Sequence, residues 1–577
     1  MTELTLWAPT PNRVRLWLPD SDPRPMTRLN DGWWAITTDQ LQDGGDYGFL
    51  LDDDATVLPD PRSRRQPAGV HGPSRHYDHP FPWTDHDWSG AGLPGAVIYE
   101  LHIGTFTPPG TLAAAEQRLP YLAELGVTHV EVLPVNDFNG QWNWGYDGVL
   151  WYAVHEAYGG PDGLKSFVNE CHRLGLAVVL DVVYNHLGPS GNYLPRFGPY
   201  LTSGRNTWGD LINLDGEDAG PVRAYIIENA LMWLDEFHVD GLRLDAVHAL
   251  KDSSPTHILA ELSERVDALA DTVGRELTLI AESDLNDPVM ITPRAQGGYG
   301  LDAQWNDDVH HCWHALLTGE RQGYYADFGT LPGLAKVYQR AFFHDGTYSS
   351  FRKAKHGKPV DPQATPGYRF VVCLQNHDQV GNRAAGDRVS HITSLASVKI
   401  GAVLLLTSPF TPMIWMGEEW AAGTRWPFFT SHPEPELAKA TAQGRIAEFA
   451  EHGWDVSQVI DPQDPLAFER AKLDWGERSR GDHGIVGELY RRLLALRGEH
   501  PELADGRLDQ IRVDYDEDAQ WLAVYRGSLI IAVNLADHSA GLPIAVSGVI
   551  LATEGGVRVE PSSLVLPPRS AAIATGK

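Results

Sequence analysis

The chain has 577 residues, of which 42% are hydrophobic, and these values predict a packed globular protein with more than one domain. Its net charge of −30 argues against nucleic acid and membrane surfaces as partners and favours a neutral or cationic ligand. The 19 tryptophans fit sugar or aromatic ligands, but they fit a large core equally well.

Cysteine usage and the start of the chain indicate a cytoplasmic protein. The three cysteines, Cys171, Cys312 and Cys373, lie far apart among apolar neighbours without metal-ligand spacing, so we expect buried, reduced thiols. The opening residues lack the basic-then-apolar pattern of a signal peptide, and no apolar run reaches the roughly 18 residues of a membrane span. We expect a soluble monomer.

Residues 1–90 are expected to form an N-terminal β-sandwich. Short apolar runs are separated there by Pro, Asp and Gly, as is typical of small β domains. The runs are residues 4–8, 14–18, 33–36 and 47–51. Residues 60–79 have the composition of a loop and lead towards the next domain.

Residues 91–503 alternate strand and helix, which predicts an α/β fold, a (β/α)8 TIM barrel with loop insertions. Near-continuous apolar strands between helices are typical of a parallel sheet, and the length and number of units fit a barrel. The predicted strands are 96–104, 128–135, 176–186, 241–250, 277–283, 300–305, 369–378 and 412–420, of which 300–305 is weakly marked.

Three helices of this region have clear apolar faces. Asp162 is expected to cap a helix that carries its apolar face from Leu164 to Leu174 and ends at Gly175. The other two faces are Ile226, Ala230, Trp233 and Phe237, and, in the last helix of the barrel, Ile485, Leu489, Leu493 and Leu496. Residues 504–577 return to β alternation and predict a C-terminal β-sandwich.

Five predicted barrel strands begin with apolar residues and end with polar ones. The carboxyl ends of barrel strands meet at one face, so we expect these ends to surround one pocket. The clusters are Asp181, Asn185 and His186; Arg243, Asp245 and His248; Glu282; Asn376, His377 and Asp378; and Glu418 and Glu419.

Three of these carboxylates, Asp245, Glu282 and Asp378, predict the cleavage of a glycosidic bond. Crowded carboxylates keep at least one of their number protonated, while Arg243 favours the ionised form of Asp245. One protonated and one ionised acid are what glycosidic cleavage requires, so we expect Asp245 to act as nucleophile and Glu282 as proton donor, then base.

Two other interpretations of these acids remain open. Each acid could belong to a solvated loop, as most Asp and Glu residues do. Asp181, Asn185 and nearby carbonyls could instead hold calcium, which prefers oxygen ligands, but no EF-hand spacing is present and we predict no metal site.

Four of the segments resemble the strand-end regions of the α-amylase family, glycoside hydrolase family 13, in that family's order. They are "DVVYNH" (181–186), "GLRLDAVHA" (241–249), "IAES" (280–283) and "LQNHD" (374–378). The resemblance covers roughly residues 95–500, and the flanking regions resemble the family's N-terminal glycan-binding-type, immunoglobulin-like module and its C-terminal β domain. It implies a retaining mechanism without a cofactor, in which Asp378 stabilises the transition state.

Further segments resemble a branch of that family that cuts the α-1,4 bond beside the terminal trehalose of maltooligosyl-trehalose. They are residues 99–106, 142–148, 188–202, 280–287, 301–311 and 376–383. The resemblance implies release of trehalose and a maltooligosaccharide, and maltooligosyltrehalose synthase as a pathway partner. It also implies sugar contacts from Tyr146, His186, Arg243, His248, Asp307, Asp308, His310, His311, His377 and Gln379.

The segment "LDAQWNDDVHH" (301–311) is the predicted trehalose site. Trehalose is bent and non-reducing, and paired carboxylates, paired histidines and Trp305 offer hydrogen bonds and an apolar platform. A solvated acidic turn with a core tryptophan would give the same pattern. The rival functions are a glycogen branching or debranching enzyme of the same superfamily, which these loops argue against, and a non-catalytic glycan-binding protein, which the intact carboxylates argue against.

Overall fold

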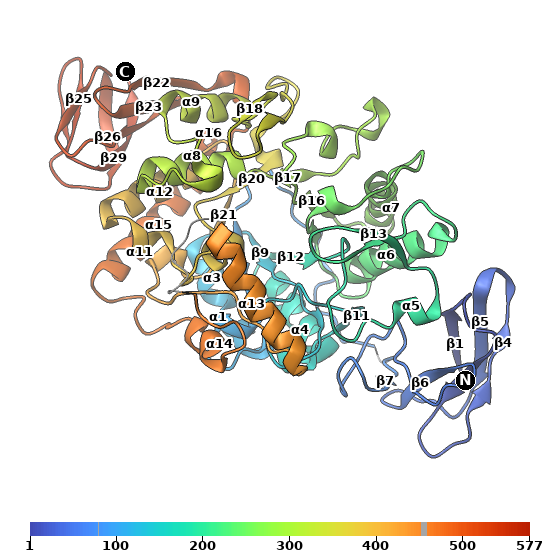
Figure 1. The fold of residues 1–577 in the computed structure, drawn as a ribbon. Coiled ribbons are helices and arrows are strands. Elements are labelled where there is room, and N and C mark those ends of the chain that lie inside the picture. The colour runs from blue at the N-terminus through green and yellow to red at the C-terminus, as the bar shows by residue number, and fades with distance from the viewer. Residues whose placement is uncertain (79, 452–458) are drawn as a thin grey trace.

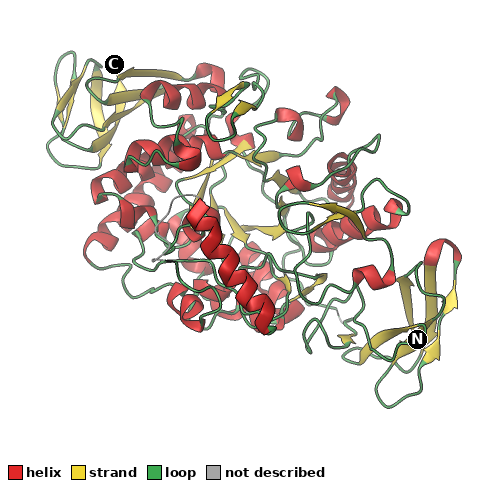
Figure 2. Ribbon diagram, in the orientation of Figure 1, coloured by secondary structure: helices red, strands yellow, loops and turns green. Residues whose placement is uncertain are grey.

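The computed structural model describes residues 1–78, 80–451 and 459–577 and has a central barrel with a β domain at each end of the chain (Figures 1 and 2). The N-terminal domain contains two small antiparallel sheets whose buried side chains share one core, which confirms the predicted sandwich. One sheet is β1 (Thr2–Trp7), β5 (Trp33–Thr38) and β4 (Thr27–Arg28), and the other is β3 (Arg24–Pro25), β2 (Val14–Trp17), β6 (Asp46–Leu51) and β7 (Ser74–Arg75).

Eight parallel strands close into a barrel in chain order, as the sequence predicts. Each strand pairs with the next, and the last pairs with the first. They are β8 (Ile98–Leu101), β9 (His129–Val132), β12 (Ala177–Val182), β15 (Gly241–Leu244), β16 (Thr278–Ala281), β17 (Ala303–Trp305), β20 (Phe370–Cys373) and β21 (Thr411–Trp415).

Several strands are shorter than predicted, because the polar residues at their ends lie just beyond the ladder. The predicted strand 176–186 ends at Val182, and 241–250 ends at Leu244. After Asp245 the chain turns sharply, with Ala246 in the left-handed region at a φ of 40°. The polar ends therefore occupy loops at the barrel mouth, where their side chains reach an open space.

The alternation of side chains along each strand separates an apolar layer from a charged one inside the barrel. Ile98, Val179, Ile280, Ala303, Val371 and Met413 belong to one buried apolar cluster inside the barrel. Two residues further along β8, β12 and β16 the same face carries Glu100, Asp181 and Glu282. The strand period thus brings charge to the carboxyl end of the barrel.

The helices of the barrel cover its outer face, with two departures from the predicted pattern. The principal helices are α3 (Leu119–Leu125), α4 (Gly160–Arg173), α6 (Ala219–Asp235), α7 (Ile258–Val273), α8 (Asp307–Thr318), α9 (Leu331–Arg340), α12 (Leu395–Leu406) and α15 (Gly481–Glu499), while α13 (Pro435–Glu451) contributes side chains to the open space at the barrel mouth. Gly159 caps α4 instead of Asp162, because Pro161 lets the helix begin earlier, and Gly175 follows its end as predicted. In α15, Val486 is buried while Ile485 is 53% exposed.

The C-terminal domain contains two antiparallel sheets with a core of their own, as predicted. The larger is β22 (Arg512–Asp516), β23 (Trp521–Arg526), β24 (Leu529–Asn534), β29 (Ser570–Gly576) and β26 (Val546–Ala552), and the smaller is β25 (Ala540–Leu542), β28 (Leu564–Leu566) and β27 (Arg558–Val559). The domain limits at residues 90 and 503 stay predictions. The three cysteines are buried and free, as expected. Within the described ranges, no helix has the length and apolar character needed to cross a membrane.

Arg497 joins the last helix of the barrel to the segments beside it. This buried side chain of α15 donates through Nη1 to the carbonyl oxygens of Leu406 and Ser408, both at 3.1 Å, and of Leu503, at 2.9 Å. Its Nη2 donates to the carbonyl oxygen of Phe410 at 3.0 Å. One guanidinium thus satisfies carbonyl groups that water does not reach.

We predict that Arg497→Leu lowers the free energy of unfolding by about 3 kcal/mol, because buried carbonyl groups lose their donors. The midpoint of thermal unfolding, followed by circular dichroism, measures this effect. The control is Arg491→Leu on the same helix, whose exposed ion pair with Glu488 is worth at most about 1 kcal/mol. Equal midpoints for the two variants would contradict the prediction.

Candidate active site

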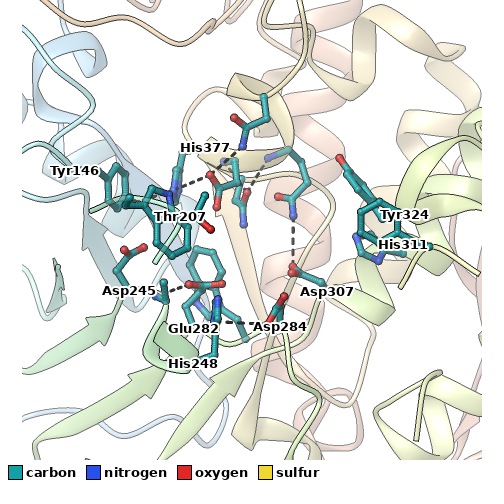
Figure 3. A pocket seen from close by; sticks show the side chains of 18 of the residues that line it. Tyr146, Thr207, Asp245, His248, Glu282, Asp284, Asp307, His311, Tyr324 and His377 are labelled. Atoms are coloured by element: carbon teal, nitrogen blue, oxygen red, sulfur yellow. Dashed lines mark hydrogen bonds and ion pairs between the residues drawn. The ribbon is translucent and has the colours of Figure 1, made fainter. Parts of the chain in front are cut away.

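A pocket of about 760 Å³ opens at the carboxyl ends of the barrel strands (Figure 3). In the close-up, Tyr146 and Asp245 lie at one end of the pocket, His311 and Tyr324 at the other, and Glu282 and Asp307 between them. The structure brings most of the predicted site residues to its wall. They are Tyr146, His186, Asp245, His248, Glu282, Trp305, Asp307, Asp308, His311, His377, Asp378 and Gln379.

The three predicted catalytic carboxylates come from three different strands. Asp245 and Glu282 are the first residues beyond β15 and β16, and their backbone N–H groups still bond to the neighbouring strands. Asp378 lies in the first turn of α10 (His377–Gly381), which follows β20. The side chains of Asp245, Glu282 and Asp378 are 12%, 17% and 45% exposed, so Asp378 is the most open to an incoming ligand.

Arg243 lies beneath the pocket, although the sequence predicts it as a direct sugar contact. Its side chain is fully buried, and Nη1 lies 2.8 Å from Asp181 Oδ2 and 2.7 Å from Asp245 Oδ1. Its Nη2 lies 3.8 Å from Glu282 Oε2, and the guanidinium packs 4.2 Å from the ring centre of Trp305. The prediction is corrected: inward projection from β15 places Arg243 under the carboxylates, where it orients them.

Glu282 and Asp245 have opposite surroundings. Burial raises the pKa of Glu282 to about 8; Arg243 opposes this shift, and the charge of Asp245 adds to it. Asp245 accepts hydrogen bonds from Arg243 at 2.7 Å and from Asn185 Nδ2 at 2.7 Å, both of which favour a carboxylate. At neutral pH the site therefore holds a proton on Glu282, beside an Asp245 side chain that two donors hold in place.

Tyr146 connects two walls of the pocket through its hydroxyl group. The hydroxyl donates to Asp181 Oδ2 at 2.6 Å and lies 2.8 Å from His377 Nε2. The Tyr146 and His377 rings stack with their centres 5.2 Å apart. Because Asp181 is also bonded to Arg243, one chain of polar contacts runs from His377 to the carboxylate of Asp245.

The residues proposed as calcium ligands are engaged with neighbouring side chains. Asp181 accepts from Tyr146 and Arg243, and Asn185 donates to Asp245. The Asn185 Oδ1 atom lies 2.6 Å from His186 Nδ1. Across the part of the chain that the structure describes, no group of three or more His, Cys, Asp or Glu side chains is arranged to hold a metal ion.

The predicted trehalose segment supplies two carboxylates with different surroundings. Burial raises the pKa of Asp307 to about 6, and the charge of Asp378 adds to the shift. The Oδ1 atom of Asp307 lies 3.4 Å from Gln379 Nε2. Asp308 Oδ2 accepts from Asn286 Nδ2 at 2.8 Å and from the backbone N–H groups of Phe343 and His344 at 2.8 and 2.7 Å. Asp307 thus has fewer protein partners than Asp308, which also holds the loop beside it.

Two further predictions are corrected by the structure. His310 lies outside the pocket, where its Nε2 is 3.2 Å from the Tyr325 hydroxyl, because α8 turns this residue away from the face that carries Asp307 and His311. Glu418 and Glu419 do not join the pocket wall either. The 3-10 helix η8 (Glu418–Trp420) follows β21 after two intervening residues and turns them towards tyrosines: the buried Tyr490 for Glu418, and the buried Tyr99 and half-buried Tyr121 for Glu419.

Sequence reasoning missed much of the pocket's outer wall. Arg352 Nη2 donates to Asp284 Oδ2 at 2.8 Å, and it comes from the hairpin of β18 (Thr347–Ser349) and β19 (Ala354–His356). The other missed residues include Trp144, Thr207, Trp208, Tyr324, Phe328, Phe351, Phe428 and Arg445. Trp144 and Asp284 lie inside residues 142–148 and 280–287, which resemble the family, so both could have been predicted as pocket residues. The others lie on insertions without a periodic pattern.

The chain is similar to known glycosidases along its whole length. Residues 76–196 match the family model for the α-amylase catalytic domain, and residues 506–573 match a domain of unknown function, DUF3459. The malto-oligosyltrehalose trehalohydrolase of Arthrobacter ramosus is 56% identical over 575 residues, covering 98% of both chains. The protein of that name from Rhizobium sp. (strain M-11) is 54% identical, covering 98% of this chain and 96% of its own.

A solved structure agrees with these relatives. A putative α-amylase from Salmonella typhimurium is 38% identical, superposes with a TM-score of 0.91, and covers all of this chain and 97% of its own. The fold of this chain is therefore seen along nearly the whole length of a solved chain.

We predict that Arg243→Leu lowers kcat by about 10²–10³-fold, the effect of removing one preorganised electrostatic partner from a reacting site. Arg243 lowers the pKa of Glu282, so its removal should move the alkaline limb of the pH–rate profile to higher pH. Steady-state kinetics between pH 4 and 10 measure both effects. Unchanged turnover with an unmoved alkaline limb would contradict the role given to Arg243.

Proposed function

Because the chain belongs to the malto-oligosyltrehalose trehalohydrolase family of α-amylase-type glycosidases, we propose that it hydrolyses the α-1,4 bond next to the terminal trehalose of maltooligosyl-trehalose. The products are trehalose and a maltooligosaccharide. The observation that carries this proposal is the pocket in which Glu282, whose pKa is raised to about 8, and Asp245 share one buried guanidinium. The alternatives of a branching or debranching enzyme and of a glycan-binding protein are not favoured.

The first chemical step transfers the sugar to the enzyme. Asp245 attacks the anomeric carbon, and Glu282 donates its proton to the 4-oxygen of the departing trehalose, so the C–O bond breaks as the glycosyl-enzyme bond forms. Asp378, exposed to the pocket, holds the hydroxyl groups of the distorted ring and binds it more tightly in the transition state.

The second step returns the enzyme to its starting state. Glu282, now ionised, takes a proton from water, and the hydroxide attacks the same anomeric carbon and releases Asp245. Two displacements on one carbon leave its configuration unchanged, which makes the enzyme retaining. The buried position of Glu282 serves both steps, because a pKa near 8 lets this group give and recover a proton close to neutral pH.

The released trehalose unit is proposed to bind at the end of the pocket that contains Asp307 and His311. Asp307 and Gln379 can accept and donate hydrogen bonds, and the stacked rings of His311 and Tyr324, with centres 5.1 Å apart, give an apolar surface. Tyr146, His186, His248, Trp305, Asp308 and His377 remain proposed sugar contacts on the pocket wall. Maltooligosyltrehalose synthase as the source of the substrate, a cytoplasmic location and a monomeric state also remain proposals.

Maltotriosyl-trehalose and maltopentaose differ in the terminal disaccharide, so a comparison of the two tests the trehalose end of the pocket. We expect release of trehalose from the first at least about tenfold faster than cleavage of the second, because the trehalose end of the pocket adds contacts worth more than about 1.4 kcal/mol in the transition state. Chromatography of the products measures both rates. Equal rates would indicate a general α-glucanase and contradict the assignment of residues 301–311.

The proton on Glu282 determines how the activity depends on pH. The acid form is required in the first step and is lost as pH rises through its pKa of about 8, so kcat/KM should fall above about pH 8. Glu282→Gln should lower kcat by about 10²–10⁴-fold, because the amide cannot donate an acidic proton or take one from water. A glycan-binding protein would keep its affinity and show no turnover in either form.

A further inference from the structure

Two buried glutamates stand side by side inside the barrel but have different partners. Glu100 on β8 and Glu131 on β9 are paired in register, and neither is exposed to solvent. Glu100 Oε1 lies 2.5 Å from His377 Nδ1, and Glu100 Oε2 accepts the backbone N–H of His377 at 3.1 Å. Neither carboxyl oxygen of Glu131 has a hydrogen-bond partner among the described residues. The same side chain in adjacent, matched positions therefore has two different environments.

The hydrogen bonds around His377 determine where its protons lie. The Tyr146 hydroxyl has one proton, which points to Asp181 Oδ2 at 2.6 Å, so its oxygen must accept from His377 Nε2 at 2.8 Å. On the other side of the ring, Nδ1 faces the carboxylate of Glu100 at 2.5 Å and donates to it. With N–H groups on both nitrogens, the ring is an imidazolium.

The charges that face His377 agree with this assignment. Burial alone would lower its pKa, but Asp378, at 3.6 Å from Nε2, and Glu100 raise it to about 9 against the opposing charge of Arg243. The other titratable neighbours are Asp181, whose pKa burial raises to about 6, His102, whose pKa burial lowers to about 3, and Glu131, whose pKa burial raises well above its usual range. His102 and Glu131 are therefore neutral near pH 7, and Asp181 is mostly ionised there and favours the cation. The remaining contacts of the ring are the aromatic side chains of Trp144, Trp305 and Trp415.

We propose that Glu100 is a positioning residue that keeps His377 doubly protonated, and that the resulting imidazolium orients Tyr146 and Asp378 around the sugar at the cleavage point. Glu100 touches neither substrate nor the reacting atoms, and it acts through His377. The cation fixes the direction of the Tyr146 hydroxyl, and it draws the exposed carboxylate of Asp378 towards one wall. This inference rests on the proposed function, since it assumes that Asp378 acts in glycosidic cleavage.

The test replaces each glutamate by its uncharged isostere. Glu100→Gln removes the charge that holds the proton on His377, so kcat at pH 7.5 should fall about tenfold, the effect of losing a hydrogen bond to a charged group. The ratio of its kcat to that of the wild type should rise as the pH is lowered from 8 to 5.5, because protonation restores the imidazolium. Glu131→Gln is the matched control and should change kcat less than about twofold at every pH, because an amide replaces an already neutral carboxyl group.

The substrate is whichever of maltotriosyl-trehalose and maltopentaose the wild type cleaves faster, so the test does not depend on trehalose specificity. A loss in Glu100→Gln that is the same at every pH, no loss at all, or an equal loss in Glu131→Gln would overturn the proposal. Thermal unfolding of each variant verifies that it is folded.

A second measurement needs no substrate and no active variant. The wild type is labelled with ¹⁵N-histidine, and the His377 signal is assigned by its absence in His377→Gln. A doubly protonated ring at pH 7.5 is expected, and a neutral ring would overturn the proposal even if the enzyme cleaves its substrate as proposed. Conversely, the protein could contain an imidazolium at His377 and release no trehalose from maltotriosyl-trehalose. That result would contradict the proposed function and leave the proposal for Glu100 standing.

Discussion

The site depends on one buried interaction, the contact of the Arg243 guanidinium with the carboxylates around it. A buried cation is stable only where nearby negative charge compensates for lost hydration, and Asp181 and Asp245 provide this at 2.8 and 2.7 Å. Trp305 covers the face of the guanidinium and keeps water away. Because the cation cannot move, the atoms that it holds cannot move either, and the nucleophile is oriented before any sugar arrives.

Around this cation, identical functional groups differ in charge because their surroundings differ. Glu282 lies near other carboxylates, which help to raise its pKa to about 8, whereas Asp245 accepts two strong hydrogen bonds. Inside the barrel, Glu131 has no hydrogen-bond partner among the described residues and is neutral. The state of each carboxyl group thus depends on the donors and charges around it, not on the residue type.

The period of the strands made the barrel and two of the proposed catalytic carboxylates, Asp245 and Glu282, predictable from the sequence. Alternation along β15 places Arg243 on the inner face, and the position just beyond the strand brings Asp245 to the mouth. Glu100 was equally predictable, since it follows Ile98 by two residues on the same inward face of β8. His310 could be placed only after α8 was known to begin at Asp307. An α-helix turns by about 100° per residue, so Asp307, His311 and Asp308 lie on one side of it, and His310 points away from the middle of that side. Glu418 and Glu419 were not predictable, since a short 3-10 helix after β21 has no periodic signal.

The two ends of the pocket are built by different parts of the chain. The residues proposed to break the bond are therefore separate from those proposed to select the leaving group. The end near Tyr146 and Asp245 is fixed by a buried polar chain whose members project from barrel strands or contact them. The end near Tyr324 belongs to the insertion after α8, and the ion pair of Arg352 with Asp284 ties the hairpin of β18 and β19 to the segment that begins at Glu282. A change in the insertion can therefore alter which leaving group fits without disturbing the cation that orients the nucleophile. Such a division allows one barrel chemistry to serve many glucan substrates, and it explains why the catalytic residues were predictable from strand periodicity while most of the selecting residues were not.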